Sequence, residues 1–380
     1  MADFIRVDKM WNGEFQYGNP ENDIEQHLTP IIINRAKGSD FGRFRIQHTG
    51  HGMDDPSGCS EFCSRWRQLT FDGEIVDHRY MWKDCGDNPL YPQGGTWIFD
   101  RAYWCPGDLQ VPDIIDIPLT KSRHELDLNM EPFTANNLDQ PKEQISSYFF
   151  QYSSPNSSND VAVEEIIAPN KKDNYNRFNP SGFNPLVKIR NLGSTRLTSL
   201  DIIYTTDGFD QKIYRWKGSL DFYEATIISL PGIIDSRVGL NKFSVVVSKP
   251  NGQNDEWPGD NMMVSEFKSV PVIPSTFVID FLTNNRPGEN DLFIISSDGD
   301  TVFNRPSSML RAATNYSDTL SLPDGNYNLM LTDTAGDGLE FWFLAGAGYG
   351  RLRLKDRDGN LIELFESDCG NGIFYSFRAD

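Results

Sequence analysis

The chain is poor in the residues that build metal sites and positively charged surfaces. Of its 380 residues only five are histidine and five are cysteine, and 35 basic side chains face 54 acidic ones. The resulting net charge of −19 opposes contact with phosphate backbones and anionic lipid, so we expect no nucleic-acid partner. No apolar run reaches the roughly 18 residues of a membrane-spanning helix, so we expect no membrane insertion. The first residues also lack the basic and then apolar pattern of a signal peptide.

Helical periodicity is nearly absent as well. Short runs of alternating apolar and polar residues recur instead, for example at 43–47, 200–204 and 243–247. Asp-Gly pairs such as Asp72-Gly73 and Asp207-Gly208 separate these runs, as expected of turns between strands. The pattern predicts an all-β protein.

The spacing of these strands suggests three sandwiches in a row. We expect a jelly-roll-like β-sandwich at 1–169 and an immunoglobulin-like sandwich at 170–271, because the second segment has the length and the short strands of that fold. A further C-terminal β-sandwich should occupy 275–380, where Asp and Gly are concentrated in the turns.

The cysteines are unevenly distributed. Four of them fall early in the chain and one stands alone, at Cys59, Cys63, Cys85, Cys105 and Cys369. A zinc site and two disulfides are both conceivable, but the four spacings do not form two C-x2-C knuckles. Disulfides suit the acidic, loop-rich composition better and indicate export to an oxidising compartment. Cys369 is then expected to be a free thiol.

The densest chemical segment runs from 48 to 107. Glu61 lies between two cysteines, and a disulfide there would hold its carboxylate in the orientation that a general acid or base needs. Arg101 offers a rigid set of donors for a sugar oxygen, and Trp104 a flat apolar face for a sugar ring. The plainer interpretation makes Glu61 an exposed loop residue and Trp104 a core residue.

His48 and His51 raise the question of copper, with methionines nearby at Met53, Met81 and Met130. Their spacing of three suits a strand poorly, because neighbours on one face are two residues apart. A copper monooxygenase is therefore the least favoured hypothesis.

The segment from about 44 to 117 resembles the second sandwich domain of the peptide-N-glycosidase F family. Three motifs appear in order: G-C-S-E-F-C at 58–63, N-P with G-T-W at 88–97, and D-R-A-Y-W-C-P-G at 100–107. These enzymes hydrolyse the amide that joins an asparagine side chain to the first N-acetylglucosamine of an N-linked glycan. The resemblance implies an N-glycosylated protein or glycan as partner, and no cofactor for this domain.

The resemblance also implies residue roles. It implies disulfides Cys59–Cys63 and Cys85–Cys105, and makes Glu61 an active-site carboxylate. Substrate-binding positions in the same cleft fall on Phe62, Arg101, Trp104 and His51.

One departure limits the activity expected of this chain. Family enzymes carry their principal catalytic aspartate in a D-x-W-D-R-like motif on a first sandwich domain, and this sequence has no such motif. We expect a missing N-terminal domain or a partner chain to complete the site, and the chain alone to be weak or inactive. The alternative is a noncatalytic glycan-binding or surface adhesion protein.

The third segment is rich in carboxylates on glycine-containing turns, which suit calcium. The candidate ligands are Asp333, Asp337, Glu340, Asp298 and Asp300, to which Asp368 could be added. A set of ordinary Asp-Gly turns explains the same pattern. The segment resembles C-terminal modules of secreted Bacteroidetes-type enzymes, so we expect the protein to be secreted or at the cell surface, on the outer-membrane exterior or in the periplasm.

Overall fold

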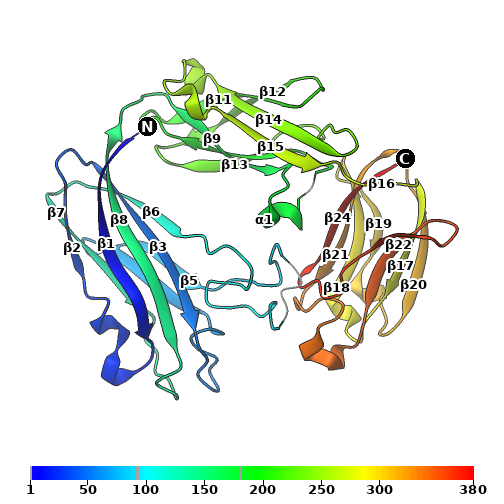
Figure 1. The fold of residues 1–380 in the computed structure, drawn as a ribbon, viewed down its shortest axis with the longest axis horizontal. Helices are drawn as coiled ribbons and strands as arrows, with labels where there is room; N and C mark the ends of the chain where they lie inside the picture. Colours follow the sequence, from blue (N-terminus) through cyan, green and yellow to red (C-terminus); the bar gives the residue numbers. More distant parts are fainter. Residues whose placement is uncertain (1, 91–94, 180) are drawn as a thin grey trace. The chain divides into compact units, whose positions relative to one another are not determined.

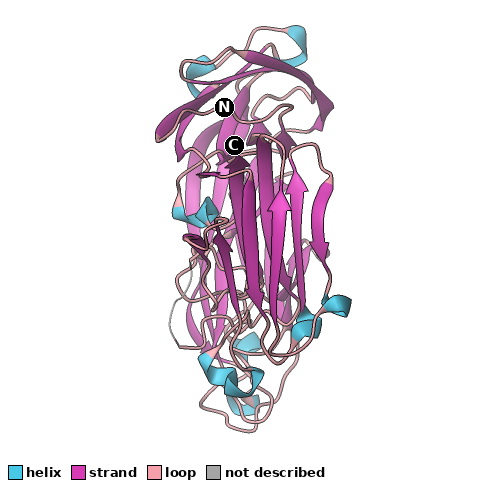
Figure 2. Cartoon of the chain, turned by 90° about the vertical axis from the view of Figure 1, so that its right-hand side faces the viewer, coloured by secondary structure: helices cyan, strands magenta, loops and turns pink. Residues whose placement is uncertain are grey.

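The computed structural model describes residues 2–90, 95–179 and 181–380, and its regular secondary structure is mostly β-strand (Figure 1). Figure 2 shows that helix is limited to short turns in the connections, including α1 (Asp173–Asn176). The predicted all-β class is confirmed. Within the described ranges, no helix has the length and apolar character to cross a membrane. The contacts divide the chain into two compact units.

The first unit comprises Met1–Cys85 and Phe99–Asn156 and contains two antiparallel sheets. One sheet has the order β1-β8-β3-β6, formed by Ala2–Gln16, Lys142–Pro155, Phe41–His51 and Asp113–Pro118. The other has the order β2-β7-β4-β5, formed by Ile31–Asn34, Arg123–Met130, Arg65–Phe71 and Glu74–Met81. Alternate residues of β3, among them Phe44 and Ile46, are fully buried and belong to the same core cluster as Leu128 of β7.

The second unit comprises Gly86–Ile98 and Ser157–Asp380. Its first sandwich has one sheet of order β13-β10-β9, formed by Ala225–Ser229, Leu186–Asn191 and Val161–Ala168. The facing sheet has the order β12-β11-β14-β15, formed by Lys212–Leu220, Leu197–Thr206, Leu240–Ser248 and Met262–Lys268. Ile202, Val245 and Phe267 are buried in its core.

Strand β9 differs from the sequence-based expectation, which made it the last strand of the first sandwich. It pairs with β10 instead, because Val161, Val163 and Ile166 bury their side chains in the core of the second sandwich. The structure therefore places the end of the first unit at Asn156 rather than at 169.

A third sandwich follows from Val272 onward. One sheet has the order β16-β24-β21-β18-β19, formed by Val272–Ile273, Gly372–Ala379, Gly325–Asp333, Asn290–Ser296 and Thr301–Arg305. The other has the order β20-β17-β22-β23, formed by Asn315–Ser321, Thr276–Leu282, Arg351–Lys355 and Leu361–Leu364. Its core contains Phe277, Leu329 and Cys369, which is a free thiol as expected. Burial raises the pKa of the Cys369 thiol to about 12.

The segment Gly86–Ile98 packs with the second unit. The fully buried Trp97 donates its indole N–H to Asp368 over 3.1 Å, and Asn371 donates its backbone N–H to the carbonyl of Gly86 over 3.0 Å. Asp368, considered above as a calcium ligand, is therefore a hydrogen-bond acceptor for a tryptophan. Residues 91–94 of the N-P to G-T-W motif lie outside the described residues.

Candidate functional site

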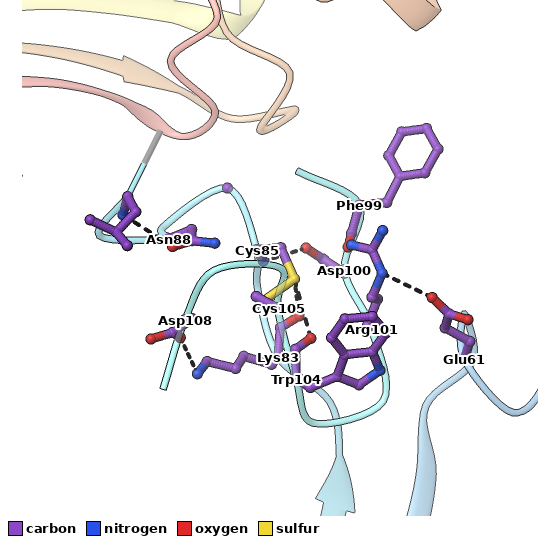
Figure 3. Close-up of a disulfide and its surroundings, with 12 residues drawn as sticks. Glu61, Lys83, Cys85, Asn88, Phe99, Asp100, Arg101, Trp104, Cys105 and Asp108 are labelled. Carbon is purple, nitrogen blue, oxygen red and sulfur yellow. Dashed lines mark hydrogen bonds and ion pairs between the residues drawn. A yellow bond between two sulfur atoms is a disulfide. The ribbon is translucent and has the colours of Figure 1, made fainter. Parts of the chain in front are cut away.

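Two long loops that begin and end in the first unit carry the residues that the sequence singled out. One joins β3 to β4 and is closed by the disulfide Cys59–Cys63, with a Cα–Cα distance of 4.9 Å. The other joins β5 to β6, and its base is closed by Cys85–Cys105 (Figure 3), with a Cα–Cα distance of 5.4 Å. Both pairings are those implied by the resemblance.

Backbone hydrogen bonds tie the two loops to the end of β3. Glu61 donates its N–H to the carbonyl of Gly52 over 2.9 Å, and its own carbonyl accepts the N–H of Ala102 over 2.8 Å. Gly50 completes the contact with a 3.0 Å bond to the carbonyl of Ala102. A Cβ atom on Gly50 would lie 2.6 Å from the carbonyl oxygen of Ser60, so only glycine allows this approach.

Glu61 and Arg101 form an ion pair at the meeting point of the loops. The Nε atom of Arg101 donates to Oε1 of Glu61 over 3.1 Å, and its Nη1 donates to the carbonyl of Phe99 over 2.6 Å (Figure 3). The Arg101 side chain is 5% exposed and that of Glu61 is 21% exposed. The buried guanidinium of Arg101 therefore holds Glu61 in place, and the carboxylate of Glu61 remains partly exposed to solvent.

Aromatic rings enclose the guanidinium of Arg101. Its Cζ atom lies 5.1 Å from the ring centroid of Phe62 and 5.1 Å from that of Trp104, in the range of cation–π contacts. The indole N–H of Trp104 donates to the carbonyl of Gly50 over 3.0 Å. The ring of His51 lies 5.2 Å from that of Trp104. The structure thus brings together all five residues to which the sequence assigned catalysis or substrate binding, and their roles remain predictions.

Trp104 and His51 also line a groove on the sheet that contains β1, β3 and β8. Its volume is about 660 Å³, and amide side chains from several strands and loops line it, namely Asn12, Gln47, Gln110 and Gln144. An aromatic face beside several amide donors and acceptors is the combination that sugar rings and their hydroxyl groups require.

The sequence analysis missed a buried polar network beneath Glu61. The hydroxyl of Ser60 donates to Glu143 over 2.6 Å, and Nε2 of His48 lies 3.1 Å from the other oxygen of that carboxylate. Burial lowers the pKa of His48, although Glu143 acts in the opposite direction. The alternation of β3 could have revealed the inward position of residue 48. The network fixes Ser60, the neighbour of Glu61, to the sheet.

The same alternation bears on the copper hypothesis. His48 is fully buried on the inner side of β3, whereas His51 lies on the outer side beside Trp104. The two rings therefore do not face a common metal ion.

The carboxylates expected to bind calcium do not all meet. In the described part of the chain, the carboxylates that cluster are Asp333, Asp337 and Glu289, a residue that the sequence analysis did not include. Asp298 and Asp300 follow the opposite end of β18, about 20 Å away at ~3.3 Å per residue, so they are not part of this cluster and their role as ligands stays a prediction. Glu340 is exposed and is not part of this cluster either, so its role as a ligand also stays a prediction.

The fold and the loop cluster define a class: a β-sandwich domain whose two long loops are closed by disulfides. Residues 21–154 match the family model described as peptide-N-glycosidase F, C terminal. A curated relative is peptide-N(4)-(N-acetyl-beta-D-glucosaminyl)asparagine amidase F from Elizabethkingia miricola. It is 33% identical over 84 residues, which make up 21% of this chain and 23% of the relative.

Solved structures give weaker similarities. Peptide-N-glycosidase F from Flavobacterium meningosepticum, described as a glycosylasparaginase, shares 23% identity over 39% of this chain and 51% of its own, with a TM-score of 0.35. A domain of a cell surface protein from Methanosarcina acetivorans shares 17% identity over 30% of this chain and 92% of its own, with a TM-score of 0.23. The match thus spans about a quarter of the curated relative and half of the solved enzyme.

Proposed function

We propose that this chain recognises N-linked glycans of glycoproteins through the loop cluster around Glu61, Arg101 and Trp104. The observation that carries the proposal is the convergence of these three side chains beside an amide-lined groove, within the segment that matches the peptide-N-glycosidase F domain. Trp104 and His51 offer ring faces for a sugar, and the groove amides offer donors and acceptors for its hydroxyl and acetamido groups.

Glu61 is the carboxylate that we propose for the chemical step. In amide hydrolysis, water attacks the side-chain carbonyl of the glycosylated asparagine, the C–N bond breaks, and the asparagine becomes aspartate. This reaction needs a base for the water and help for the leaving amine. Glu61 supplies one such group, and we propose that a further domain or a partner chain supplies the second.

The nearby Asp54 is not available for that second role. It is fully buried, and its carboxylate accepts hydrogen bonds from Ser57, Asn136 and the backbone N–H of Asn137. This observation favours the second candidate function, a protein that binds glycan without cleaving it.

We also propose that the protein acts outside the cytoplasm, in a secreted form or at the cell surface. Its two disulfides support this, because such bonds rarely persist in reducing compartments.

The proposal is tested with a denatured N-glycoprotein. Retention of its glycopeptides on the immobilised chain is expected, together with loss of retention after prior removal of the glycan. A mass shift on the substrate reports cleavage. The variant Glu61→Gln should abolish any cleavage and weaken retention about tenfold, because the charge that pairs with Arg101 is lost. Glu74→Gln, at the exposed start of β5, is the matched control and should change neither.

Equal retention of glycosylated and deglycosylated peptides would refute glycan recognition. Retention without cleavage would select the noncatalytic candidate. Cleavage that survives Glu61→Gln would remove Glu61 from the mechanism.

A further inference from the structure

Four polar side chains of the third sandwich meet at one end of β18 and β21. Carboxylate oxygens of Glu289, Asp333 and Asp337 lie within 4.8 Å of one another. Asn290 is paired with Asp333 in the strand ladder, and its amide nitrogen donates to Oδ2 of Asp333 over 2.6 Å. The pairing of the two strands thus places an amide directly against the carboxylate cluster.

Three of these four side chains are removed from solvent, and Glu289 is partly exposed. Asn290 is 0% exposed, and Asp333 and Asp337 are each 5% exposed. Three oxygens, one each on Asn290, Asp337 and Glu289, are buried and meet no hydrogen-bond donor. Burying polar oxygens without a partner is destabilising, and in folded proteins it calls for a compensating group. The unpaired amide oxygen of Asn290 points to a ligand independently of the carboxylate cluster, because the amide carries no charge.

The charges of the cluster do not balance. When all three carboxylates are ionised they carry three negative charges, and Arg286 offsets one of them through a 3.0 Å ion pair with Asp337. Two negative charges remain, which matches the charge of one divalent cation.

We propose that Glu289, Asn290, Asp333 and Asp337 form a calcium-binding site. All of the side-chain ligands are hard oxygens, which suit calcium or magnesium and exclude a preference for zinc. Carboxylates combined with a neutral amide oxygen on irregular turns fit the flexible shell of calcium better than the strict octahedron of magnesium.

Such an ion would join two turns that the sequence separates widely. Glu289 ends the turn before β18, and Asp333 begins the turn after β21, where its Oδ1 accepts the N–H of Gly336 over 2.7 Å. The two turns already meet through a 2.9 Å bond from the N–H of Thr334 to the carbonyl of Glu289. Calcium would therefore stabilise this end of the third sandwich.

The test is titration calorimetry of the full chain with CaCl2 after dialysis against EDTA, together with thermal melting. We expect one calcium ion per chain and a rise in Tm of several degrees. Glu289→Gln and Asp333→Asn should each weaken calcium binding at least tenfold. Asp333→Asn should also raise the Tm of the calcium-free protein, because it removes one of the crowded negative charges. If Asp333 only holds the fold together and binds no ion, Asp333→Asn should instead lower the Tm of the calcium-free protein.

Asp298→Asn is the matched control, since this exposed aspartate lies in a similar Asp-Gly turn at the other end of β18. It should bind calcium like the unsubstituted chain. No heat and no shift of Tm at millimolar CaCl2 would overturn the proposal, and so would equal loss of binding in Asp298→Asn. A Tm shift with MgCl2 but none with CaCl2 would overturn the choice of calcium.

Discussion

Glu61 and Arg101 illustrate how neighbours decide what a charged side chain can do. Arg101 donates to Glu61 and to the carbonyl of Phe99, so it holds the carboxylate of Glu61 in one orientation. Glu61 keeps part of its carboxylate exposed. Beneath it, Ser60 is fixed by Glu143, a residue more than 80 positions away in the chain. The candidate carboxylate is thus positioned from two sides.

Asp72 provides a prediction at the residue scale. It occupies the left-handed region at φ 53°, and its carboxylate accepts bonds from Lys121, His124 and the N–H of Glu125. Burial alone would raise its pKa, but these bonds outweigh burial and lower it to about 2. The folded pKa is therefore below that of the unfolded chain. The stabilisation is present above pH ~4 and is lost as the pH falls toward 2.

The variant Asp72→Asn keeps a residue that tolerates this backbone conformation and removes the charge. We expect the free energy of unfolding to fall by about 1 kcal/mol at pH 7. Denaturant unfolding at several pH values should show the difference from the unsubstituted chain shrinking between pH 4 and 2. Asp207→Asn, in an exposed Asp-Gly turn, should show no such pH dependence. A difference that stays constant down to pH 2 would contradict the assignment.

At the scale of elements, the end of β3 decides where the site forms. The strand alternates between inward and outward side chains until Gly50, where the lack of a side chain lets the two disulfide-closed loops approach the backbone. This close approach brings Glu61 next to Arg101 and Trp104.

We therefore predict that Gly50→Ala disturbs both stability and binding. Its Cβ atom would lie 2.6 Å from the carbonyl oxygen of Ser60 and 2.7 Å from the Cβ of Ala102, so the loops must move. The free energy of unfolding should fall by about 2 kcal/mol, and glycopeptide retention should fall with it. Gly346→Ala is the control, because its Cβ would meet no atom within 4 Å. Normal retention by Gly50→Ala would show that the site tolerates displaced loops.

At the scale of the whole molecule, the two compact units should respond to different treatments. Both disulfides lie in the first unit, and the proposed calcium site lies in the second. The bond Cys85–Cys105 spans 20 residues, for which loop entropy suggests a contribution of about 3 kcal/mol.

We expect differential scanning calorimetry to show two transitions. A reducing agent should lower the Tm of one, and CaCl2 should raise the Tm of the other. Variants that remove Cys85 and Cys105 together should reproduce the effect of reduction without touching the calcium-sensitive transition. A single transition that both treatments shift would contradict the independence of the units.

The sequence by itself determined the all-β fold, the four bonded cysteines with one free thiol, and the similarity of one segment to a known domain family. These features depend on local signals: alternation along strands, Asp-Gly turns, and rare residues at fixed spacing, such as Cys59, Glu61 and Cys63. These patterns involve residues that are close together in the sequence, so they can be recognised without knowledge of the tertiary structure.

Only the tertiary structure decided which distant residues meet. The pairing of β18 with β21 joins Asn290 to Asp333 and brings in Glu289, while Asp298 lies a strand length away despite its similar Asp-Gly context. The fold likewise places Glu143 under Ser60 and assigns β9 to the second sandwich. Sheet register and core burial are properties of the folded chain as a whole, so no short stretch of sequence specifies such contacts.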